Sequence, residues 1–151
     1  MSGPEQILID RYFAELLNKG EFAGTNEILT QDFVFHGPSI PGGLGIAGFM
    51  TYIEEMRAAF SNKRFTELER IVEGNRAAVR FRMTGTQDGP YQGLPPLGGS
   101  IDVEGCDLIL VRSGKIAEVR AYFDLVAVIQ KLLVPPPVRL FGELIGHLWA
   151  R

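Results

Sequence analysis

A single carboxylate lies among apolar residues in the stretch IDVEGCDLILV, residues 101–111. If this stretch is a strand, its side chains alternate between two faces, so Asp102 and Glu104 share one face and Asp107 takes the other. The face of Asp107 is otherwise apolar, with Ile101, Val103, Ile109 and Val111. A carboxyl group in such surroundings tends to stay protonated and can donate a hydrogen bond, and burial without a partner is costly. The pattern therefore predicts an inward-facing Asp107 with a polar partner.

The elements that must position Asp107 change character along the chain. The first part has apolar residues at helical spacing in 4–17, 23–29 and 46–60, with a strand at 33–36. The second part alternates polar and apolar residues in strands expected at 64–74, 76–86, 100–112 and 115–124, followed by a helix at 125–133. Helices first and a strand meander afterwards predict an α+β domain, with the helices on one side of an antiparallel sheet.

Composition and motif spacing exclude several classes of protein. The 151 residues suffice for one domain with a sizeable core, and a net charge of −3 without a Lys/Arg run argues against nucleic-acid binding. His36 and His147 lie far apart without Cys or acidic ligands at motif spacing, so no metal site is expected. The chain start lacks the pattern of a secretory signal, and no apolar run is long enough to cross a bilayer. We therefore expect a cytoplasmic protein that does not bind membranes.

Two stretches of the sequence carry a family resemblance. They are GTQDGPYQGLPPLGGSIDVEGCDLILVRSGKIAEVRAYFD continued by LVAVIQKL, and DFVFHGP followed by a Gly-rich loop and a helix ending in AAF. Both resemble the SnoaL-like polyketide cyclases. The resemblance implies the nuclear-transport-factor-2-like fold, a cone-shaped curved antiparallel sheet wrapped around about three N-terminal helices, with a pocket inside and no cofactor. We expect one such domain over residues 1–134 and an amphipathic extension over 135–151 that forms an extra C-terminal helix.

The catalytic residues of these relatives are only partly matched. Polyketide cyclases of this family use an aspartate as acid or base on the last strand, at a position that falls on Ala121. They can have a histidine on the preceding strand, where this chain has Asp107. Limonene-type epoxide hydrolases also need an aspartate at the position of Ala121, and their Arg–Asp pair falls near RFRMT, which has no Asp. Hydrolysis of an epoxide or lactone is therefore disfavoured.

Ketosteroid isomerases are similar at other positions. Their first helix carries a tyrosine in an RY pair, matched by Tyr12, and their oxyanion-hole aspartate lies in a strand similar to CDLILV, at Asp107. Their general base precedes a proline and falls on Gly37, with His36 beside it. The resemblance thus implies that Tyr12 and Asp107 donate hydrogen bonds to an enolate oxygen, and His36 is the candidate base.

Each of these three residues also has a structural interpretation. Asp107 could bond a helix amide or Tyr12, Tyr12 could be a core tyrosine, and His36 could bond backbone at the end of its strand. A bulge before Pro38 would also exchange the faces of His36 and Phe35. The three residues therefore form one site only if each side chain points inward.

The residues and the resemblance together predict a cyclase or isomerase. It would act through an enolate-type intermediate on a hydrophobic, polyketide-like or steroid-like carbonyl compound, which suits a large apolar pocket. The residues expected to bind this ligand are Met50, Met56, Phe81, Met83, Val103, Val119, Ala121 and Phe123. The alternative is a non-catalytic ligand-binding or dimerisation domain, because Ala121 and Gly37 stand where relatives keep an acid or base.

Two parts of the sequence concern association with other proteins. The outer sheet face carries Leu108, Leu110 and Tyr122 among charged residues, a mixture that suits a homodimer interface. Dimers are also usual in the fold family that the chain resembles. The tail 138–151 has a wide apolar stripe, but its basic residues are only Arg139 and Arg151, so we expect it to pack on protein rather than on a membrane.

Overall fold

The structure is a computed structural model, which describes residues 3–133. The predicted extension 135–151 lies outside the described residues. The helices are α1 (Pro4–Arg11), the π-helix η1 (Tyr12–Lys19), α2 (Thr25–Ile28), α3 (Ile46–Ala59) and α4 (Leu125–Leu133). The strands are β1 (Leu29–His36), β2 (Arg64–Glu73), β3 (Arg76–Thr86), β4 (Ser100–Arg112) and β5 (Lys115–Phe123). In the described part of the chain, no helix has the length and apolarity needed to span a membrane.

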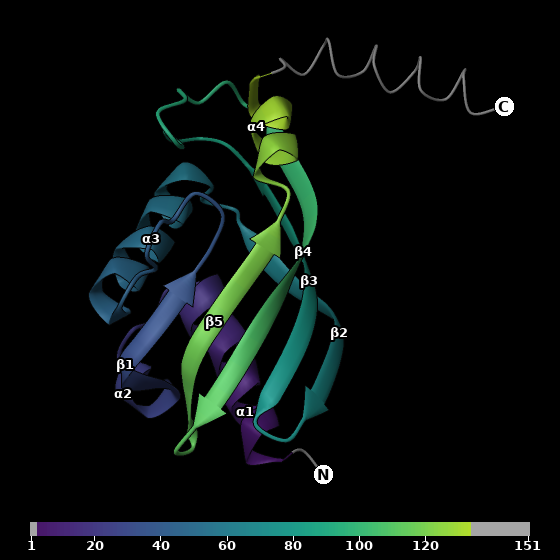
Figure 1. Cartoon of the computed structure of the whole chain (residues 1–151). Helices are drawn as coiled ribbons and strands as arrows, with labels where there is room; N and C mark the ends of the chain where they lie inside the picture. Colours follow the sequence, from purple (N-terminus) through teal and green to yellow (C-terminus); the bar gives the residue numbers. More distant parts are fainter. Residues whose placement is uncertain (1–2, 134–151) are drawn as a thin grey trace, which may run out of the picture.

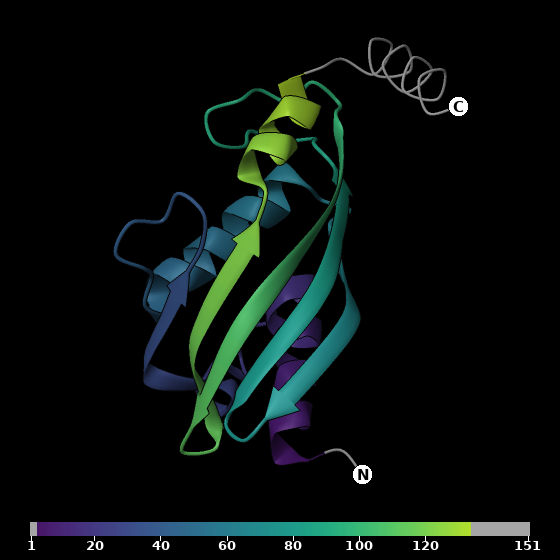
Figure 2. The same ribbon diagram turned by 45° about the vertical axis from the view of Figure 1, so that its right-hand side comes forward.

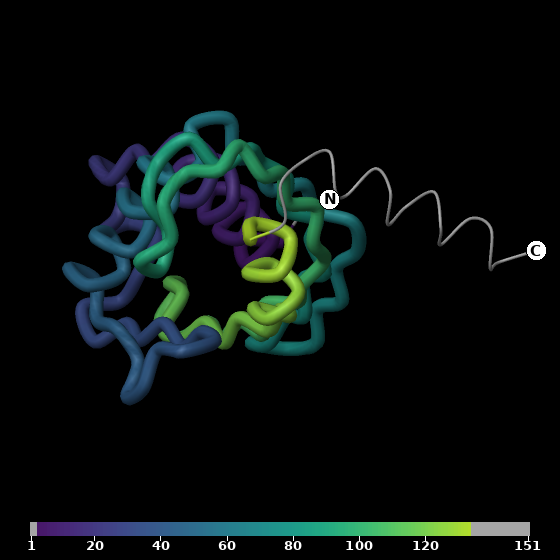
Figure 3. Tube along the Cα trace, turned by 90° about the horizontal axis from the view of Figure 1, so that it is seen from above, coloured from purple at the N-terminus to yellow at the C-terminus, as the bar shows by residue number. Residues whose placement is uncertain are grey.

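The five strands form one curved sheet in the order β1-β5-β4-β3-β2. Figures 1 and 2 show its long strands curving around α1, and the view from above in Figure 3 shows the strands and α3 surrounding α1. The predicted α+β cone is therefore confirmed. Strands β2 to β5 pair antiparallel as expected, whereas β1 joins β5 in parallel. The long connection from β1 through α3 to the meander permits this parallel pairing.

Alternation along the strands separates an apolar face from a charged one. In β3, Val79, Phe81 and Met83 are buried against the helices, while Arg80 and Arg82 are exposed. Asp107 of β4 lies on the buried face with 3% of its surface exposed. The inner and outer faces predicted from sequence are therefore confirmed, and the core fills the space between the inner face and the helices.

The first helix changes from α to π geometry at Tyr12, which the sequence pattern did not predict. A π-helix has i→i+5 hydrogen bonds, so residues five apart come close to one another on one side. Tyr12 and Leu17 therefore face the same interior space. The helix ends at Gly20, whose backbone is left-handed, with φ of 62°. The side chains of Arg57 and Lys63 donate hydrogen bonds to carbonyls of the last turn, where positive charge is favourable.

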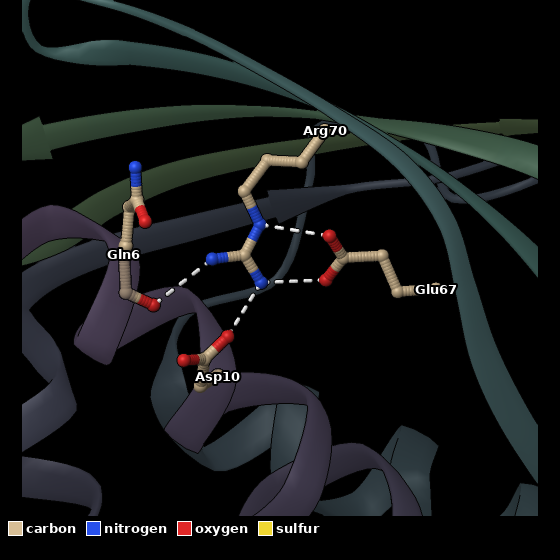
Figure 4. Close-up of polar contacts among 4 residues, drawn as sticks. All are labelled: Gln6, Asp10, Glu67 and Arg70. Atoms are coloured by element: carbon tan, nitrogen blue, oxygen red, sulfur yellow. Dashed lines mark hydrogen bonds and ion pairs between the residues drawn. The ribbon is translucent and has the colours of Figure 1, made fainter. Parts of the chain in front are cut away.

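Arg70 connects α1 to the neighbouring strand β2. Its guanidinium donates to the Gln6 carbonyl at 3.1 Å, to the Asp10 carboxylate at 2.6 Å and to both carboxylate oxygens of Glu67, as Figure 4 shows. Only 14% of the Arg70 side chain is exposed, whereas its partners Asp10 and Glu67 are 61% and 32% exposed, so the guanidinium is better shielded from water than the carboxylates. This contact fixes α1 on the sheet just before the turn that carries Tyr12.

Candidate active site

A small cavity lies between the helices and the inner face of the sheet. Its volume is about 30 Å³, which is room for one or two water molecules. Side chains from the first helix, α3 and all five strands surround it: Tyr12, Leu17, Phe35, Tyr52, Met56, Phe65, Phe81, Met83, Asp107, Ala121 and Phe123. In this lining Asp107 is the single carboxyl group, and the other side chains are apolar or phenolic.

Asp107 is buried and has no counter-charge in the cavity. Burial raises the pKa of its carboxyl group to about 8, so the neutral form predominates near pH 7. Its Oδ1 atom is buried and has no hydrogen-bond partner among the described residues. The polar partner expected from sequence is therefore missing for this atom, and the carboxyl group can offer a hydrogen bond to a bound molecule.

Tyr12 presents a second unpartnered polar atom in the same cavity. Its side chain is fully buried, its ring stacks on Phe49 with centroids 6.0 Å apart, and its hydroxyl has no partner within residues 3–133. Burial, with smaller contributions from Asp107 and Tyr52, raises the pKa of this phenol well above its ordinary value. Tyr12 therefore stays protonated and remains a hydrogen-bond donor. Two buried donors without acceptors are costly, and an oxygen atom of a ligand would satisfy both.

Tyr52 of α3 is a cavity residue that the sequence analysis missed. Burial is the main cause that raises the pKa of its phenol, with smaller contributions from Tyr91 and Asp107. A signal was available, because Tyr52 is three residues after Phe49 and four before Met56, both on the predicted inner face of this helix. Phe35, Phe65 and Leu17 were likewise absent from the predicted ligand-binding set.

His36 does not join Tyr12 and Asp107. The parallel register of β1 with β5 is regular over Val34–Glu118, Phe35–Val119 and His36–Arg120, so no bulge exchanges the faces of this strand end. Phe35 points into the cavity, and His36 lies in a separate surface pocket with Arg120 and Tyr122. The structure therefore does not bring His36 into the cavity with Tyr12 and Asp107.

The predicted ligand-binding residues divide into two groups. Met56, Phe81, Met83, Ala121 and Phe123 line the cavity. Met50, Val103 and Val119 do not. Met50 follows Phe49 and so points about a quarter-turn away on α3. Val103 is half-buried opposite Met83, and Val119 is fully buried beside Ile109 and Phe35.

A family model for the SnoaL-like polyketide cyclases matches residues 7–132. The chain belongs to this family. No curated protein matches the chain in sequence. The match extends over the helices and strands that surround the cavity, so the family assignment applies to the domain that holds Tyr12 and Asp107.

Solved structures of similar proteins have the same fold. A proposed SnoaL-like polyketide cyclase from Jannaschia sp. CCS1 is 28% identical, with a TM-score of 0.80 over 88% of this chain and 94% of that one. TsrD from Streptomyces laurentii is 25% identical, with a TM-score of 0.76 over 86% and 95%. IdmH from Streptomyces antibioticus, a proposed polyketide cyclase, is 23% identical, with a TM-score of 0.74 over 86% and 99%.

Of the two positions where SnoaL-like or isomerase relatives were expected to carry an acid or base, Ala121 lines the cavity and Gly37 lies in the neighbouring surface pocket. Ala121 is directly opposite Asp107 in the pairing of β4 with β5. A Cβ atom at Gly37 would lie 3.1 Å from the Phe35 ring and 3.2 Å from Ile40. Among the described residues, no group of three His, Cys, Asp or Glu side chains could hold a metal ion. Asp107 is the carboxyl group that the cavity lining offers for acid–base chemistry.

Proposed function

We propose that this SnoaL-like chain binds a hydrophobic carbonyl compound and promotes its enolisation, leading to ring closure or isomerisation. The observation that supports the proposal is the pair of unpartnered polar atoms on Tyr12 and Asp107 in one apolar cavity. The family model supports cyclase-type chemistry in general. The enolate-type mechanism and the polyketide-like or steroid-like substrate are part of the proposal.

In the proposed mechanism the carbonyl oxygen of the ligand accepts hydrogen bonds from Tyr12 and Asp107. Neutral Asp107 transfers its proton to this oxygen, and the resulting carboxylate accepts a proton from the carbon next to the carbonyl group. The proton count balances, because the ligand gains one proton on oxygen and loses one from carbon. A pKa of about 8 suits both halves of this cycle near neutral pH, while Tyr12 stabilises the oxygen throughout.

Asp107 can do this work although the family acid is absent at Ala121. Residues directly opposite each other in an antiparallel pair have Cβ atoms about 5 Å apart, and Asp107 and Ala121 form such a pair. A carboxyl group on β4 can therefore reach much of the space that one on β5 would occupy. We propose that Asp107 takes over the role of the missing aspartate.

Binding of 2-naphthol, a phenol that mimics an enolate, tests the donor pair. Tyr12→Phe and Asp107→Leu should each weaken its affinity by about tenfold, because each removes one hydrogen bond to the phenol oxygen. Naphthalene, which lacks the oxygen, is the matched control. The original chain and both variants should bind it equally. If both variants bind 2-naphthol as tightly as the original chain, the donor pair is not the binding site. Equal losses for both ligands would instead indicate damaged packing.

Turnover of a simple β,γ-unsaturated ketone tests the chemistry separately from binding. The rate should fall as pH rises through about 8, because the neutral form of Asp107 is needed to protonate the carbonyl oxygen. A rate that rises over the same range would show that ionised Asp107 acts as the base from the start, with Tyr12 as sole donor.

A non-catalytic ligand-binding domain is the second candidate. The alanine at position 121 and the glycine at position 37 favour it, because both stand where relatives keep an acid or base, and the cavity lining has a single carboxyl group. This candidate predicts the same loss of 2-naphthol affinity in Tyr12→Phe, but no turnover of any carbonyl compound at any pH.

We also propose that the outer sheet face mediates a homodimer. Leu108 is 46% and Tyr122 56% exposed on this face, among arginines and carboxylates that could pair across a two-fold axis. Leu108→Glu should convert a dimer to a monomer in analytical ultracentrifugation. A chain that is already monomeric, or that stays dimeric in this variant, would contradict the proposal.

A further inference from the structure

The cavity is much smaller than the pockets that hold drug-sized ligands, which measure roughly 300–1,000 Å³. Two surface pockets adjoin it. One, of about 570 Å³, lies between the end of β1 and β5 and shares Ala121 and Phe123 with the cavity lining. The other, of about 370 Å³, lies between α3 and the loop 90–93 and shares Tyr52 and Met56. These two pockets are the candidate routes by which a ligand reaches Asp107.

Few side chains separate the cavity from the pocket beside β5, because β1 ends before β5 does. His36, the last residue of β1, pairs with Arg120, whereas β5 continues to Phe123. Figure 1 shows β5 extending past the end of β1. No described strand pairs with this last part of β5 on the β1 side. The methyl group of Ala121 and the half-buried ring of Phe123 are the side chains that both spaces share, and Ala121 is directly opposite Asp107.

The wall beside α3 is held in place more firmly. The Gln87 side chain donates to the carbonyls of Gly89 at 3.0 Å and Leu94 at 3.2 Å, which fixes the loop that covers this side. The backbone N–H of Gly89 donates to Ala59 of α3 at 3.1 Å, and a Cβ atom at Gly89 would clash with the Ala58 carbonyl. Opening this side would break these contacts, whereas the side chains shared on the other side are those of Ala121 and Phe123, of which Phe123 is the larger.

The pocket beside β5 also has the chemistry to hold a polar group. It is lined by Arg120, His36 and the rings of Tyr122 and Phe123. The Nε of Arg120 donates to Glu118 at 2.6 Å, and a guanidinium has five N–H donors in a planar fork that suits carboxylates. The pocket therefore pairs a fixed positive charge with aromatic surface next to the opening.

We propose that the ligand reaches Asp107 through the opening between Gly37–Pro38 and Ala121–Phe123, and that Arg120 binds a carboxylate at its outer end. This inference rests on the proposed function and adds a substrate class: aromatic or polycyclic carbonyl compounds with a carboxylate on the side opposite the reacting oxygen. Phe123 is the side chain that must move, and Ala121 is the residue whose small size keeps the opening passable.

Two probes that differ by one carboxylate test the outer site. 6-Hydroxy-2-naphthoic acid carries the phenol of 2-naphthol and a carboxylate at the far end of the rings, so the protein should bind it more tightly than 2-naphthol. Arg120→Met should reduce the ratio of the two affinities by about tenfold, because a charged hydrogen bond is lost. Arg80→Met is the matched control, since Arg80 and Arg120 are both 45% exposed, and it should leave the ratio unchanged.

Glu118→Gln gives a change in the opposite direction. Glu118 competes with the ligand carboxylate for Arg120, so its replacement should increase the ratio of affinities. An unchanged ratio in both Arg120→Met and Glu118→Gln would overturn the outer site. If Tyr12→Phe also left the affinity for 2-naphthol unchanged, the proposed function itself would be contradicted. If Tyr12→Phe weakened that affinity, only the outer site would be contradicted.

Association kinetics test the opening. Phe123→Leu should speed both binding and release of 2-naphthol, because a smaller side chain lowers the barrier in both directions. Gln87→Ala, which removes the hydrogen bonds that hold the loop on the α3 side, is the control and should leave both rates unchanged. The opposite pattern, with faster exchange in Gln87→Ala alone, would place the route beside α3 and overturn this part of the proposal. Ala121→Val, which narrows the same opening, should slow both rates if the route is correct.

Discussion

Strand β4 carries two aspartates, five residues apart, in opposite environments. Asp102 is exposed on the outer face and accepts hydrogen bonds from Arg82, which is the main cause that lowers the pKa of its carboxyl group. Asp107 is buried on the inner face without a counter-charge, and burial raises its pKa to about 8. The two residues have the same side chain and differ only in the face of the strand that they occupy. Strand parity thus makes one a surface ion-pair partner and the other a potential acid.

The same contrast holds for the two faces of the sheet. On the outer face, Arg80 bridges Glu69 and Glu104, and Arg120 pairs with Glu118, all in contact with solvent. Exposed pairs of this kind contribute little to stability because water screens them. On the inner side, the hydroxyl of Tyr12 and Oδ1 of Asp107 have no hydrogen-bond partner among the described residues. Polar groups of the outer face are thus satisfied by exposed ion pairs, whereas these two inner atoms are left for a ligand in the proposed site.

The largest expected effect is on the pH dependence of stability in Asp107→Asn. The folded pKa of Asp107 is about 8 and the unfolded pKa is about 4, so the original chain loses stability as pH rises from about 4 to about 8. The variant lacks this loss, and its advantage should grow to about 5 kcal/mol at pH 8 and above. Urea unfolding at several pH values measures it, with Asp102→Asn as the outer-face control. Parallel pH curves for Asp107→Asn and the original chain would contradict this account.

Ala121→Asp tests how a second carboxyl group on the inner face changes the stability and the activity of the domain. It would lie opposite Asp107 in a cavity without a counter-charge, so the domain should lose about 3 kcal/mol at neutral pH. The two groups would share one proton, which should raise turnover of a β,γ-unsaturated ketone if cyclase-type chemistry operates here. Unchanged stability would show that position 121 faces water, contrary to its burial.

Arg70→Met is expected to have a smaller effect on the unfolding free energy, about 1 kcal/mol, because it removes several charged hydrogen bonds whose carboxylate partners are partly exposed. Arg80→Met removes exposed pairs and should change the unfolding midpoint little. Since Arg70 positions α1, its loss should also weaken 2-naphthol binding, and Arg80→Met should not. Equal losses of stability in the two variants would show that the less exposed Arg70 contributes no more to stability than the exposed Arg80.

The smallest effect is expected for Arg82→Met, which breaks the outer pair with Asp102. Stability should change little at neutral pH and low salt, and adding salt should erase any difference from the original chain, because screening weakens exposed pairs. A loss that persists in high salt would show that this pair is shielded from solvent, contrary to its exposure of about one half.

The sequence predicted the elements and the two faces of the meander well, because alternation with period two directly reports which side chains are buried. It also placed Asp107 on the inner face and, through the family resemblance, connected it with Tyr12. It did not predict the π-helix or the parallel pairing of β1, since neither leaves a periodic signal. The face of His36 depended on one possible bulge, which only the register with β5 could decide. The volume of the cavity depends on how Phe35, Phe65 and Tyr52 pack together, which no one-dimensional pattern contains.

The central claim is that Asp107 is a neutral carboxylic acid at pH 7, facing the same cavity as Tyr12. Carbon-13 NMR of the aspartate carboxyl groups, with Asp107→Asn to assign the signal, measures this directly. The account predicts a titration midpoint near 8 in the free protein, and a change in this signal when 2-naphthol binds. A midpoint near 4, the ordinary value for an exposed aspartate, would contradict the claim.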